Sequence, residues 1–213
     1  MDSISIDKRL VEKKLPELIA TDALLENVRL TPNEVEEVLT GPADDTYIYE
    51  LVTSLAKGWR EITKPDVKLD LAFEKKINKI VGFDSAFPGE LRNGSGMVIT
   101  KYGDFRPPKV NAIKEMHYLT EMTELFNARN DASVIDKAVT LLYHNMRQQL
   151  FYDGNKRTAI LVASKYLLDY GLGIIHVPAS EIDNWMDQLA RYYLTNDMDD
   201  IKKWTISHAI MTE

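Results

Sequence analysis

Hydrophobic and polar positions alternate along this chain at a helical spacing. In most segments apolar side chains recur every three or four residues, which predicts amphipathic helices that cover a shared core. Short polar stretches separate these segments. The helices are expected near residues 7–19, 32–40, 44–63, 68–81, 109–128, 132–151, 156–170, 179–194 and 198–211. The pattern therefore predicts an all-α, mainly helical bundle.

Thr31 marks the best-defined helix start in the sequence. Thr31 suits the N-cap position, Pro32 suits the first helical position, and Glu34 completes a capping box. These residues predict scaffold, and they imply no chemistry by themselves.

One stretch departs from the helical pattern. Residues 97–100 have extended character, residues 101–104 form a turn that contains Gly103, and two prolines follow Phe105. This pattern of extended residues, a turn and following prolines predicts a small β-hairpin. Without other information, the hairpin is explained as a surface element that closes the bundle.

Composition limits the classes of function. The chain has 213 residues, of which 45% are hydrophobic and 28% charged, so it is long enough for one compact domain with a substantial core. We expect a main helical domain over residues 41–213 and an N-terminal arm over residues 1–40, joined in one unit. The net charge of −7 and the pI near 5.2 argue against a nucleic-acid binder, which needs a basic face.

The chain contains no cysteine, which excludes disulfides and thiolate chemistry. The N-terminus lacks the features of a signal peptide, and no apolar run reaches the roughly 18 residues of a membrane span. A cytoplasmic protein without a membrane partner is expected. The four histidines show no paired metal-ligand spacing: His117, His144, His176 and His208.

The sequence Asp153-Gly154-Asn155 places a turn directly before a largely apolar helical run that starts at Lys156. Gly and Asn tolerate positive φ, and the free N–H groups and dipole of a helix N-terminus favour an anion. Arg157 can bind a phosphate in a bidentate fork, and Asp153 can offer an oxygen ligand to a divalent cation. The turn therefore predicts a phosphate site.

A plain structural explanation of this turn stays open, because short motifs also occur as simple connections. Two cations in a first helical turn, Lys156 and Arg157, oppose the helix dipole. Their presence is better explained if something negative lies there.

At this point the sequence resembles the Fic/Doc family, whose signature is His-x-Phe-x-Asp/Glu-Gly-Asn-Gly/Lys-Arg. The matching residues are Phe151, Asp153, Gly154, Asn155, Lys156 and Arg157, with Lys156 as in the Doc branch. The resemblance implies a Fic-like helical bundle with one small β-hairpin flap. Most members transfer AMP from ATP to a hydroxyl of a target protein, whereas the Doc branch transfers phosphate.

The same resemblance implies roles for the matching residues. Asp153 would hold Mg²⁺, and Asn155 and the backbone of Gly154 to Lys156 would bind nucleotide phosphates. Arg157 would pair with phosphate, and Phe151 would anchor the loop in the core. ATP and Mg²⁺ are the implied cofactors.

Two positions depart from the family pattern. The catalytic His falls on Gln149, and the second Arg of AMP-transferring members falls on Ile160. A general base must gain a proton near neutral pH, which the amide of Gln149 cannot do. His144 lies five residues upstream, where a helix turns it away from the face of Gln149. Activity is therefore expected to be weak or absent.

Residues 22–27 resemble the self-inhibitory segment of Fic proteins, Ser/Thr-x-x-x-Glu-Gly/Asn. Asp22 replaces the Ser/Thr, and Glu26 and Asn27 match. In the family the Glu pairs with the second Arg, but Ile160 removes that partner. Glu26 then pairs with Arg157 or Lys156, or it is a plain surface residue.

The family flap presents a target hydroxyl by pairing with an extended segment of the target protein, a form of strand addition. In this chain Lys101, Tyr102 and Arg92 would be flap or rim contacts. A purely structural role in a surface hairpin stays an equal alternative for each of them. The aromatic residues of the last two helices are expected in the core, and Tyr192 or Tyr193 would stack on a base if they border an adenine pocket.

Three functions stay open. The first is a diverged transferase of AMP or phosphate that acts on a partner protein, and the second is a catalytically silent Fic-like binding or regulatory protein. In the third, the turn at residues 153–157 is merely structural. The sequence leaves open whether the protein forms a homodimer.

Overall fold

A computed structural model describes residues 3–41, 45–65, 67–124 and 131–212. Within these ranges the fold is mainly helical, as expected, with a small antiparallel hairpin. The helices are α1 (Ser3–Leu24), α2 (Pro32–Thr40), α3 (Thr46–Ile62), α4 (Leu71–Val81), α5 (Ala112–Glu124), α6 (Asp131–Gln148), α7 (Asn155–Leu168), α8 (Ile182–Thr195) and α9 (Asp199–His208), with a short 3-10 turn, η2 (Ala179–Glu181), before α8.

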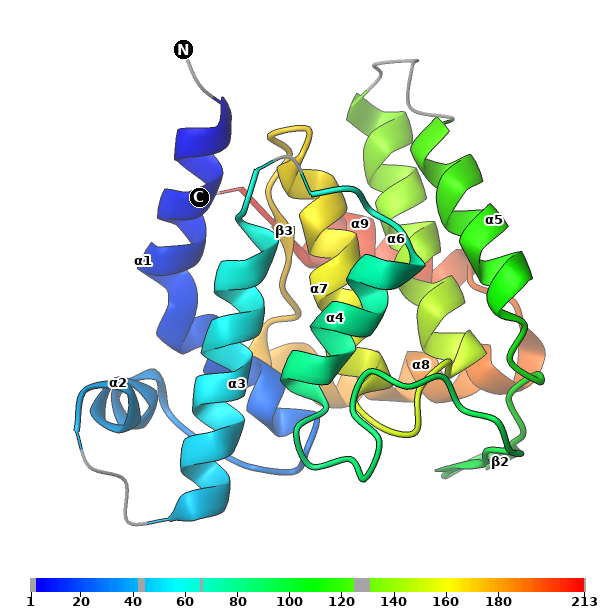
Figure 1. Cartoon of the computed structure of the whole chain (residues 1–213), viewed down its shortest axis with the longest axis horizontal. Coiled ribbons are helices and arrows are strands. Elements are labelled where there is room, and N and C mark those ends of the chain that lie inside the picture. Colours follow the sequence, from blue (N-terminus) through cyan, green and yellow to red (C-terminus); the bar gives the residue numbers. More distant parts are fainter. Residues whose placement is uncertain (1–2, 42–44, 66, 125–130, 213) are drawn as a thin grey trace.

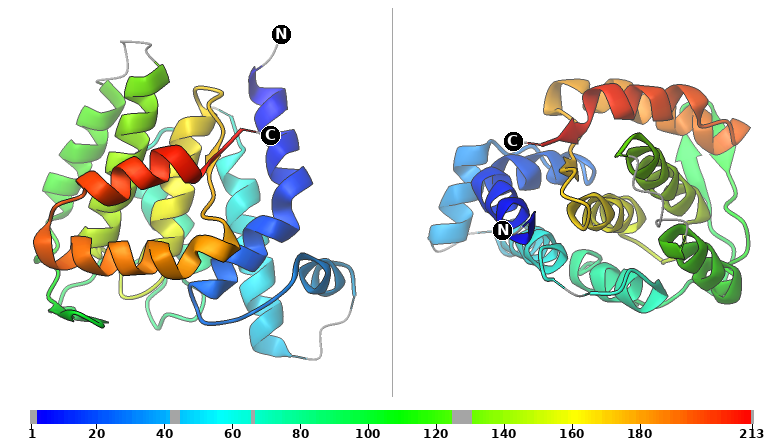
Figure 2. Two further views of the ribbon diagram at one scale, coloured as in Figure 1. Left: turned by 180° about the vertical axis from the view of Figure 1, so that it is seen from behind. Right: turned by 90° about the horizontal axis from the view of Figure 1, so that it is seen from above.

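Helix α7 lies at the centre of the molecule. Figures 1 and 2 show it enclosed by α1, α3, α4 and α6, while α8 and α9 cross behind it. Every residue of α7 except Lys156 is buried, because the sequence Ala159–Ala163 and Tyr166–Leu168 is apolar on all sides. A helix that is hydrophobic all round belongs in a core. The turn in front of α7 is therefore held on a rigid base.

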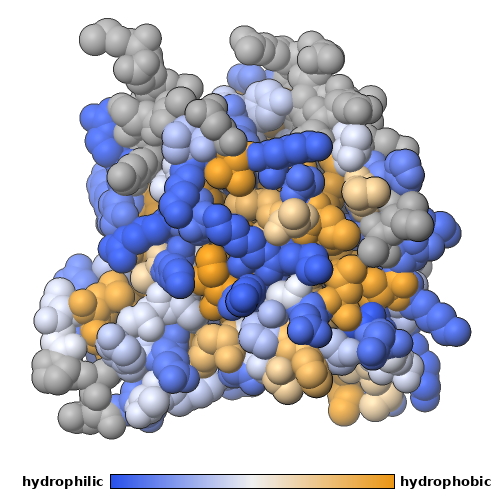
Figure 3. All heavy atoms as spheres, in the orientation of Figure 1, coloured by the Kyte–Doolittle hydropathy of each residue, from blue (hydrophilic) through white to orange (hydrophobic). Residues whose placement is uncertain are grey.

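The outer helices begin at residues that cap them. Thr31 Oγ1 accepts from the Glu34 N–H at 3.2 Å, and Glu34 Oε2 accepts from the Thr31 N–H at 2.7 Å, which confirms the predicted capping box. Asp45 caps α3 and Asp70 caps α4 in the same way, each through a side-chain oxygen. Figure 3 shows hydrophilic side chains across the middle of the face that carries α3 and α4.

Helix α1 is longer than predicted and shares the core. It extends to Leu24 instead of ending near residue 19, so it carries Asp22 in its last turns. Its buried side chains, among them Leu15, Leu18 and Ile19, belong to the same hydrophobic cluster as those of α3 and α7. Residues 10–25 of the arm are thus packed on the main bundle.

The flap is the hairpin of β1 (Val98–Thr100) and β2 (Gly103–Phe105), in which Val98 is opposite Phe105. A second small sheet was not predicted: β3 (Ile174–Ile175) pairs with β4 (Ile210–Met211). The expected helix over residues 198–211 is wrong at its end for this reason, because α9 stops at His208 and the chain becomes extended to pair with β3.

Two other boundaries differ from the prediction. The helix predicted to residue 151 ends at Gln148, so Gln149 lies in the following loop and not on a helix. The helix predicted over residues 109–128 begins at Ala112, and its expected last turn runs into residues outside the described ranges. None of the helices in the described part of the chain has the length and apolar character needed to cross a membrane.

Candidate functional site

The turn before α7 requires glycine at position 154. Gly154 has φ +70°, in the left-handed region that side chains with a Cβ rarely adopt. A Cβ at this position would also lie 3.0 Å from the Cα of Gly82 and 3.2 Å from Nδ2 of Asn78. The turn therefore presses closely against the end of α4.

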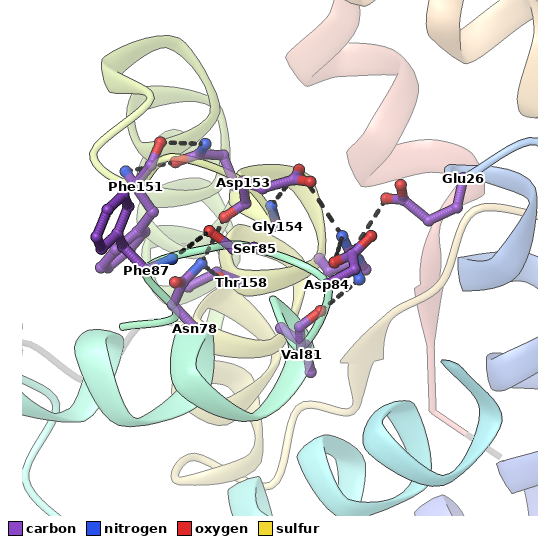
Figure 4. Close-up of polar contacts among 12 residues, drawn as sticks. Glu26, Asn78, Val81, Asp84, Ser85, Phe87, Phe151, Asp153, Gly154 and Thr158 are labelled. Atoms are coloured by element: carbon purple, nitrogen blue, oxygen red, sulfur yellow. Dashed lines mark hydrogen bonds and ion pairs between the residues drawn. The ribbon is translucent and has the colours of Figure 1, made fainter. Parts of the chain in front are cut away.

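Asn78 of α4 holds this turn in place (Figure 4). Its Nδ2 donates to the carbonyl of Asp153 at 2.8 Å and to Oγ1 of Thr158 at 3.0 Å, and its Oδ1 accepts from the Gly89 N–H at 2.9 Å. Asn78 is fully buried, so these bonds are shielded from water. Sequence analysis did not single out Asn78, although an amide on the apolar face of the predicted helix 68–81 was a signal.

The side chain of Asn155 is hydrogen-bonded to the loop that precedes it. Its Nδ2 donates to the Phe151 carbonyl and its Oδ1 accepts from the Phe151 N–H, each at 2.9 Å. Phe151 is buried, in keeping with an anchoring part. Since both polar atoms of the Asn155 side chain are bound to the main chain, only its N–H group is left to face a ligand.

The first turn of α7 keeps main-chain donors open. The Gly154 N–H donates to Oδ1 of Asp153 at 2.6 Å, and the Thr158 N–H donates to the Gly154 carbonyl at 2.9 Å. Among the described residues, the N–H groups of Asn155, Lys156 and Arg157 have no hydrogen-bond acceptor. Such donors at a helix N-terminus suit an anion.

Arg157 is fully buried and surrounded by oxygen atoms of other residues. Its Nη1 donates to the Val81 carbonyl, and its Nη2 lies 3.4 Å from Oδ1 of Asp84 and 3.8 Å from Oδ1 of Asp153. Its Nε lies 2.9 Å from Oε1 of Glu26, but the N–H does not point along this line, so the contact is an ion pair without a hydrogen bond. No face of the guanidinium is open to a ligand in this arrangement.

Glu26 reaches Arg157 because α1 ends in a left-handed turn. Asn27 has φ +58°, the Asn27 N–H donates to the Leu24 carbonyl at 3.1 Å, and the Val28 N–H donates to the Ala23 carbonyl at 3.1 Å. This is the Schellman pattern, which favours Gly or Asn at the left-handed position. The Glu-Asn pair of the sequence thus closes α1 and directs Glu26 at the turn before α7.

Burial raises the pKa of Glu26 above its ordinary value, while the positive charges of Arg157 and then Lys156 lower it. Asp84 and Asp153 add negative charge around the same guanidinium. No sequence pattern indicated Asp84, which follows α4 and comes close to Arg157 only through the fold. Ile160 is buried in the hydrophobic core, so no cation stands at that position to pair with Glu26.

Gln149 does not present its amide as an open hydroxyl-binding group. It has φ +47°, and its Nε2 donates to the Met146 carbonyl at 2.7 Å and weakly to the Tyr193 hydroxyl at 3.5 Å. His144 does not take over the missing imidazole, since its Nε2 lies 3.2 Å from Oε2 of Glu115 on α5 and its ring stacks on Tyr118.

Arg92 is a structural residue and not a rim contact. It is buried, and its guanidinium donates to the carbonyls of Gln149 at 2.8 Å, Gly94 at 2.6 Å and Pro108 at 2.9 Å. It joins the loop before α7 to the segments on both sides of the flap.

A pocket of about 460 Å³ lies between the flap and α8, and Lys156 lines it. Burial lowers the pKa of Lys156, while Glu26 raises it. The Lys156 ammonium has no ion pair or hydrogen bond to any described residue, so it is available to an anion. Apolar side chains form much of the remaining wall: Val98, Ile99, Met186, Leu189, Ala190 and Tyr193.

The flap tip is bound to α8. Tyr102 donates its hydroxyl to Oδ1 of Asp187 at 2.5 Å and accepts from Nη2 of Arg191 at 2.6 Å, and Lys101 pairs with Asp187. In this arrangement Lys101 and Tyr102 contact α8, while Ile99, with 77% of its surface exposed, is the apolar flap residue open to a partner.

The two candidate stacking residues differ. Tyr192 donates its hydroxyl to the Tyr143 carbonyl at 3.1 Å and belongs to the core. Tyr193 stacks on Phe105 with ring centroids 5.2 Å apart and lines the pocket, so only Tyr193 is placed to meet a ligand there.

Comparisons with known proteins agree on one family. The model of the Fic/DOC family matches residues 68–167. A search of curated proteins gives no match. Several solved structures share the fold, at sequence identities of 19% or less for those described below.

A Fic domain containing signalling protein from Bacteroides thetaiotaomicron has a TM-score of 0.72 and 19% identity, over 95% of this chain and 85% of that one. Fic-1 from C. elegans has a TM-score of 0.72 and 16% identity, over 96% of this chain, which spans 62% of the Fic-1 chain. BepC of Bartonella tribocorum, solved with bound AMPPNP, has a TM-score of 0.58 and 14% identity, over 84% of this chain and 89% of that one. Residues 68–167, slightly less than half of the chain, therefore match the Fic/DOC family, and the described part of the chain has the fold of solved Fic-domain proteins.

Proposed function

We propose that the protein binds a nucleoside triphosphate at the turn before α7 and that Glu26 occludes this site. The observation that carries the proposal is the pairing of buried Arg157 with Glu26, next to three main-chain N–H groups that have no acceptor in the described part of the chain. A buried cation that already has a carboxylate partner can accept a phosphate only when that carboxylate leaves.

The nucleotide phosphates would lie against the N–H groups of Asn155 to Arg157. The side chain of Lys156 would contribute its ammonium from the wall of the pocket, and the base would lie against Tyr193 and the apolar side chains of α8. These contacts combine a point charge, helix-terminal donors and an apolar wall, which suits a nucleotide.

Asp153 fits the metal that the family implies. Its carboxylate is half-exposed beside the open N–H groups, and Mg²⁺ is usually held by one or two carboxylates together with substrate phosphates. Within the described residues no three His, Asp or Glu side chains stand ready to hold a metal, so Mg²⁺ would enter with the nucleotide. When bound, the metal would neutralise phosphate charge.

The transfer step of the family reaction lacks a general base in this chain, because the amide of Gln149 cannot accept a proton from an attacking hydroxyl. We therefore infer a weak or silent adenylyltransferase whose retained property is nucleotide binding. General-base help is typically worth about 10²–10⁴-fold in rate. A phosphotransferase of the Doc type stays the second candidate, favoured by Lys156 in the signature.

Titration calorimetry with ATP and Mg²⁺ tests the binding step. Wild type should bind weakly, Glu26→Gly should bind at least about tenfold more tightly because the occluding carboxylate is gone, and Glu26→Gln should fall between them. Asp153→Ala in the Glu26→Gly background should weaken the metal-dependent part. Absence of binding in Glu26→Gly would contradict the proposal and leave the turn as a structural element.

Labelled ATP tests the transfer step. Cell lysate is incubated with wild type, Gln149→His and the double variant Glu26→Gly/Gln149→His, with ATP labelled either on the α-phosphate or on the γ-phosphate. Transfer of the α-label indicates AMP transfer, and transfer of the γ-label indicates the Doc-type reaction. Labelling by the double variant alone would identify the native chain as a silent binding protein.

A further inference from the structure

A buried carboxylate lies at the base of the segment that carries Glu26. Asp22 accepts a hydrogen bond from Nε1 of Trp59 at 2.8 Å, and only 4% of its surface is exposed. Trp59 is a fully buried residue of α3, so this bond joins the last turns of α1 to the neighbouring helix. Asp22 is a residue that neither the phosphate contacts nor the pocket uses.

The position of Asp22 connects it directly to Glu26. Asp22 lies in the last turn of α1, and Glu26 lies four residues further on, in the turn that closes this helix. The Asp22 carbonyl accepts from the Leu25 N–H at 3.1 Å, and this bond begins the left-handed turn that directs Glu26 at Arg157. Asp22 therefore contributes its side chain to the contact with α3 and its main-chain carbonyl to the turn.

Few charged or polar groups face Asp22. Trp59 faces it from α3 and Arg157 from α7, while Glu26 lies on its own segment and Asp84 and Asp153 stand beyond Arg157. Burial raises the pKa of Asp22 to about 7, and the Trp59 hydrogen bond and the Arg157 charge lower it to a smaller extent. The carboxyl therefore changes its charge near neutral pH.

We propose that Asp22 and Trp59 form a buried anchor that positions Glu26 over Arg157, and that closure of this segment is favoured at low pH because it buries the Asp22 carboxyl. The inference rests on the proposed function for its effect on nucleotide binding, although the anchor itself does not require a nucleotide. Asp22 is a positioning residue here, since it acts through Glu26 and touches no ligand.

The direction of the pH effect follows from proton binding. With the segment closed, Asp22 keeps its proton up to a pKa of about 7, while in an opened, solvated segment it returns toward 3.8. Closure therefore takes up a proton, so it is favoured at low pH and weakens as pH rises through 7. The pKa of Glu26 is also raised, so a variant is needed that separates the pH effect of Asp22 from that of Glu26.

Asp22→Asn separates them, because it keeps the acceptor for Trp59 and the shape of the side chain while it removes the titration. ATP binding to wild type should strengthen by up to about tenfold from one pH unit below 7 to one unit above it. Asp22→Asn should bind more weakly than wild type above pH 7 and show a smaller pH dependence. Equal pH profiles in the two proteins would overturn the inference.

Hydrogen exchange tests the anchor without nucleotide. The amides of residues 25–28 are hydrogen-bonded in the closed turn, and their exchange, corrected for the intrinsic effect of pH, should accelerate above pH 7 in wild type only. The Trp59 indole N–H signal should titrate with a midpoint near 7 in wild type and stay constant in Asp22→Asn. A constant signal and unchanged exchange in wild type would refute the anchor.

The two proposals can fail separately. If Glu26→Gly binds no ATP at either pH while the Trp59 signal and the exchange behave as expected, the nucleotide site is wrong and the anchor stands. If Glu26→Gly binds ATP and the Trp59 signal does not titrate, the site stands and the anchor is wrong.

Discussion

Replacement of Arg157 by Met should remove much of the stability of this fold. Met has a similar length and fills the same buried volume, but it has no donor and no charge. The Val81 carbonyl then loses its donor, and the carboxylates of Glu26 and Asp84 lose the cation that lies between them.

The size of the effect follows from these contacts. A buried carbonyl left without a donor costs about 1–3 kcal/mol, and breaking a buried ion pair costs about 3–5 kcal/mol. Glu26 and Asp84 keep some contact with water, with about a fifth to a quarter of each side chain exposed, so the lower end applies. We expect Arg157→Met to lower the free energy of unfolding by about 3–4 kcal/mol.

Urea denaturation measures this loss, and the melting temperature should fall by roughly 6–16 °C in parallel. Arg191→Met is the matched control, because Arg191 is an exposed cation whose pair with Asp187 should be worth at most about 1 kcal/mol. A loss below about 1 kcal/mol in Arg157→Met would refute the description of Arg157 as a buried ionic centre. The turn would then owe its shape to Asn78 and Gly154 alone.

Three further predictions concern other parts of the molecule. Gly154→Ala should lower the free energy of unfolding by at least about 1–2 kcal/mol, measured in urea, because φ +70° is unfavourable for Ala and its Cβ would press on Gly82. Glu74→Gln should stabilise the protein, and the gain should grow as pH rises from acidic to alkaline. Burial and then the charge of Glu115 raise the pKa of Glu74, so folding keeps a proton on this carboxyl. The wild-type protein therefore loses stability as pH rises, whereas the Gln variant has no such proton to lose. Thermal unfolding across this pH range checks the trend, and a gain that shrinks with pH contradicts it. Asp187→Asn should accelerate hydrogen exchange in residues 98–105 without changing global stability, because this carboxylate of α8 binds both Lys101 and the Tyr102 hydroxyl of the flap tip.

Local signals in the sequence were sufficient to find the helices and the turn. The capping box at Thr31 is complete within four residues, and the apolar run of α7 predicts a helix that is buried on all sides. The Phe151 and Asn155 pair is also local, but the sequence indicated only a phosphate contact for Asn155 and not its two bonds to the Phe151 main chain. A motif shows which residues come together in the chain, and the direction of a side chain depends on the backbone.

The partners of Arg157 could not be found in this way. Val81 and Asp84 lie more than seventy positions before it, and neither residue has an unusual pattern around it. The binding of the flap tip to Asp187 is likewise a contact between distant segments. Such contacts depend on how helices pack, which periodicity does not specify.

The enclosure of α7 limits how this protein can respond to a signal. A helix with neighbours on every side cannot shift without disturbing the whole core, so the open N–H groups at its first turn keep fixed positions, and the proposed nucleotide site would be ordered before its ligand binds. Conformational adjustment is then expected in the two segments next to this turn, the end of α1 and the flap. Substitutions that change the response should therefore concentrate in these peripheral segments, and those that change the affinity itself should concentrate at the fixed turn.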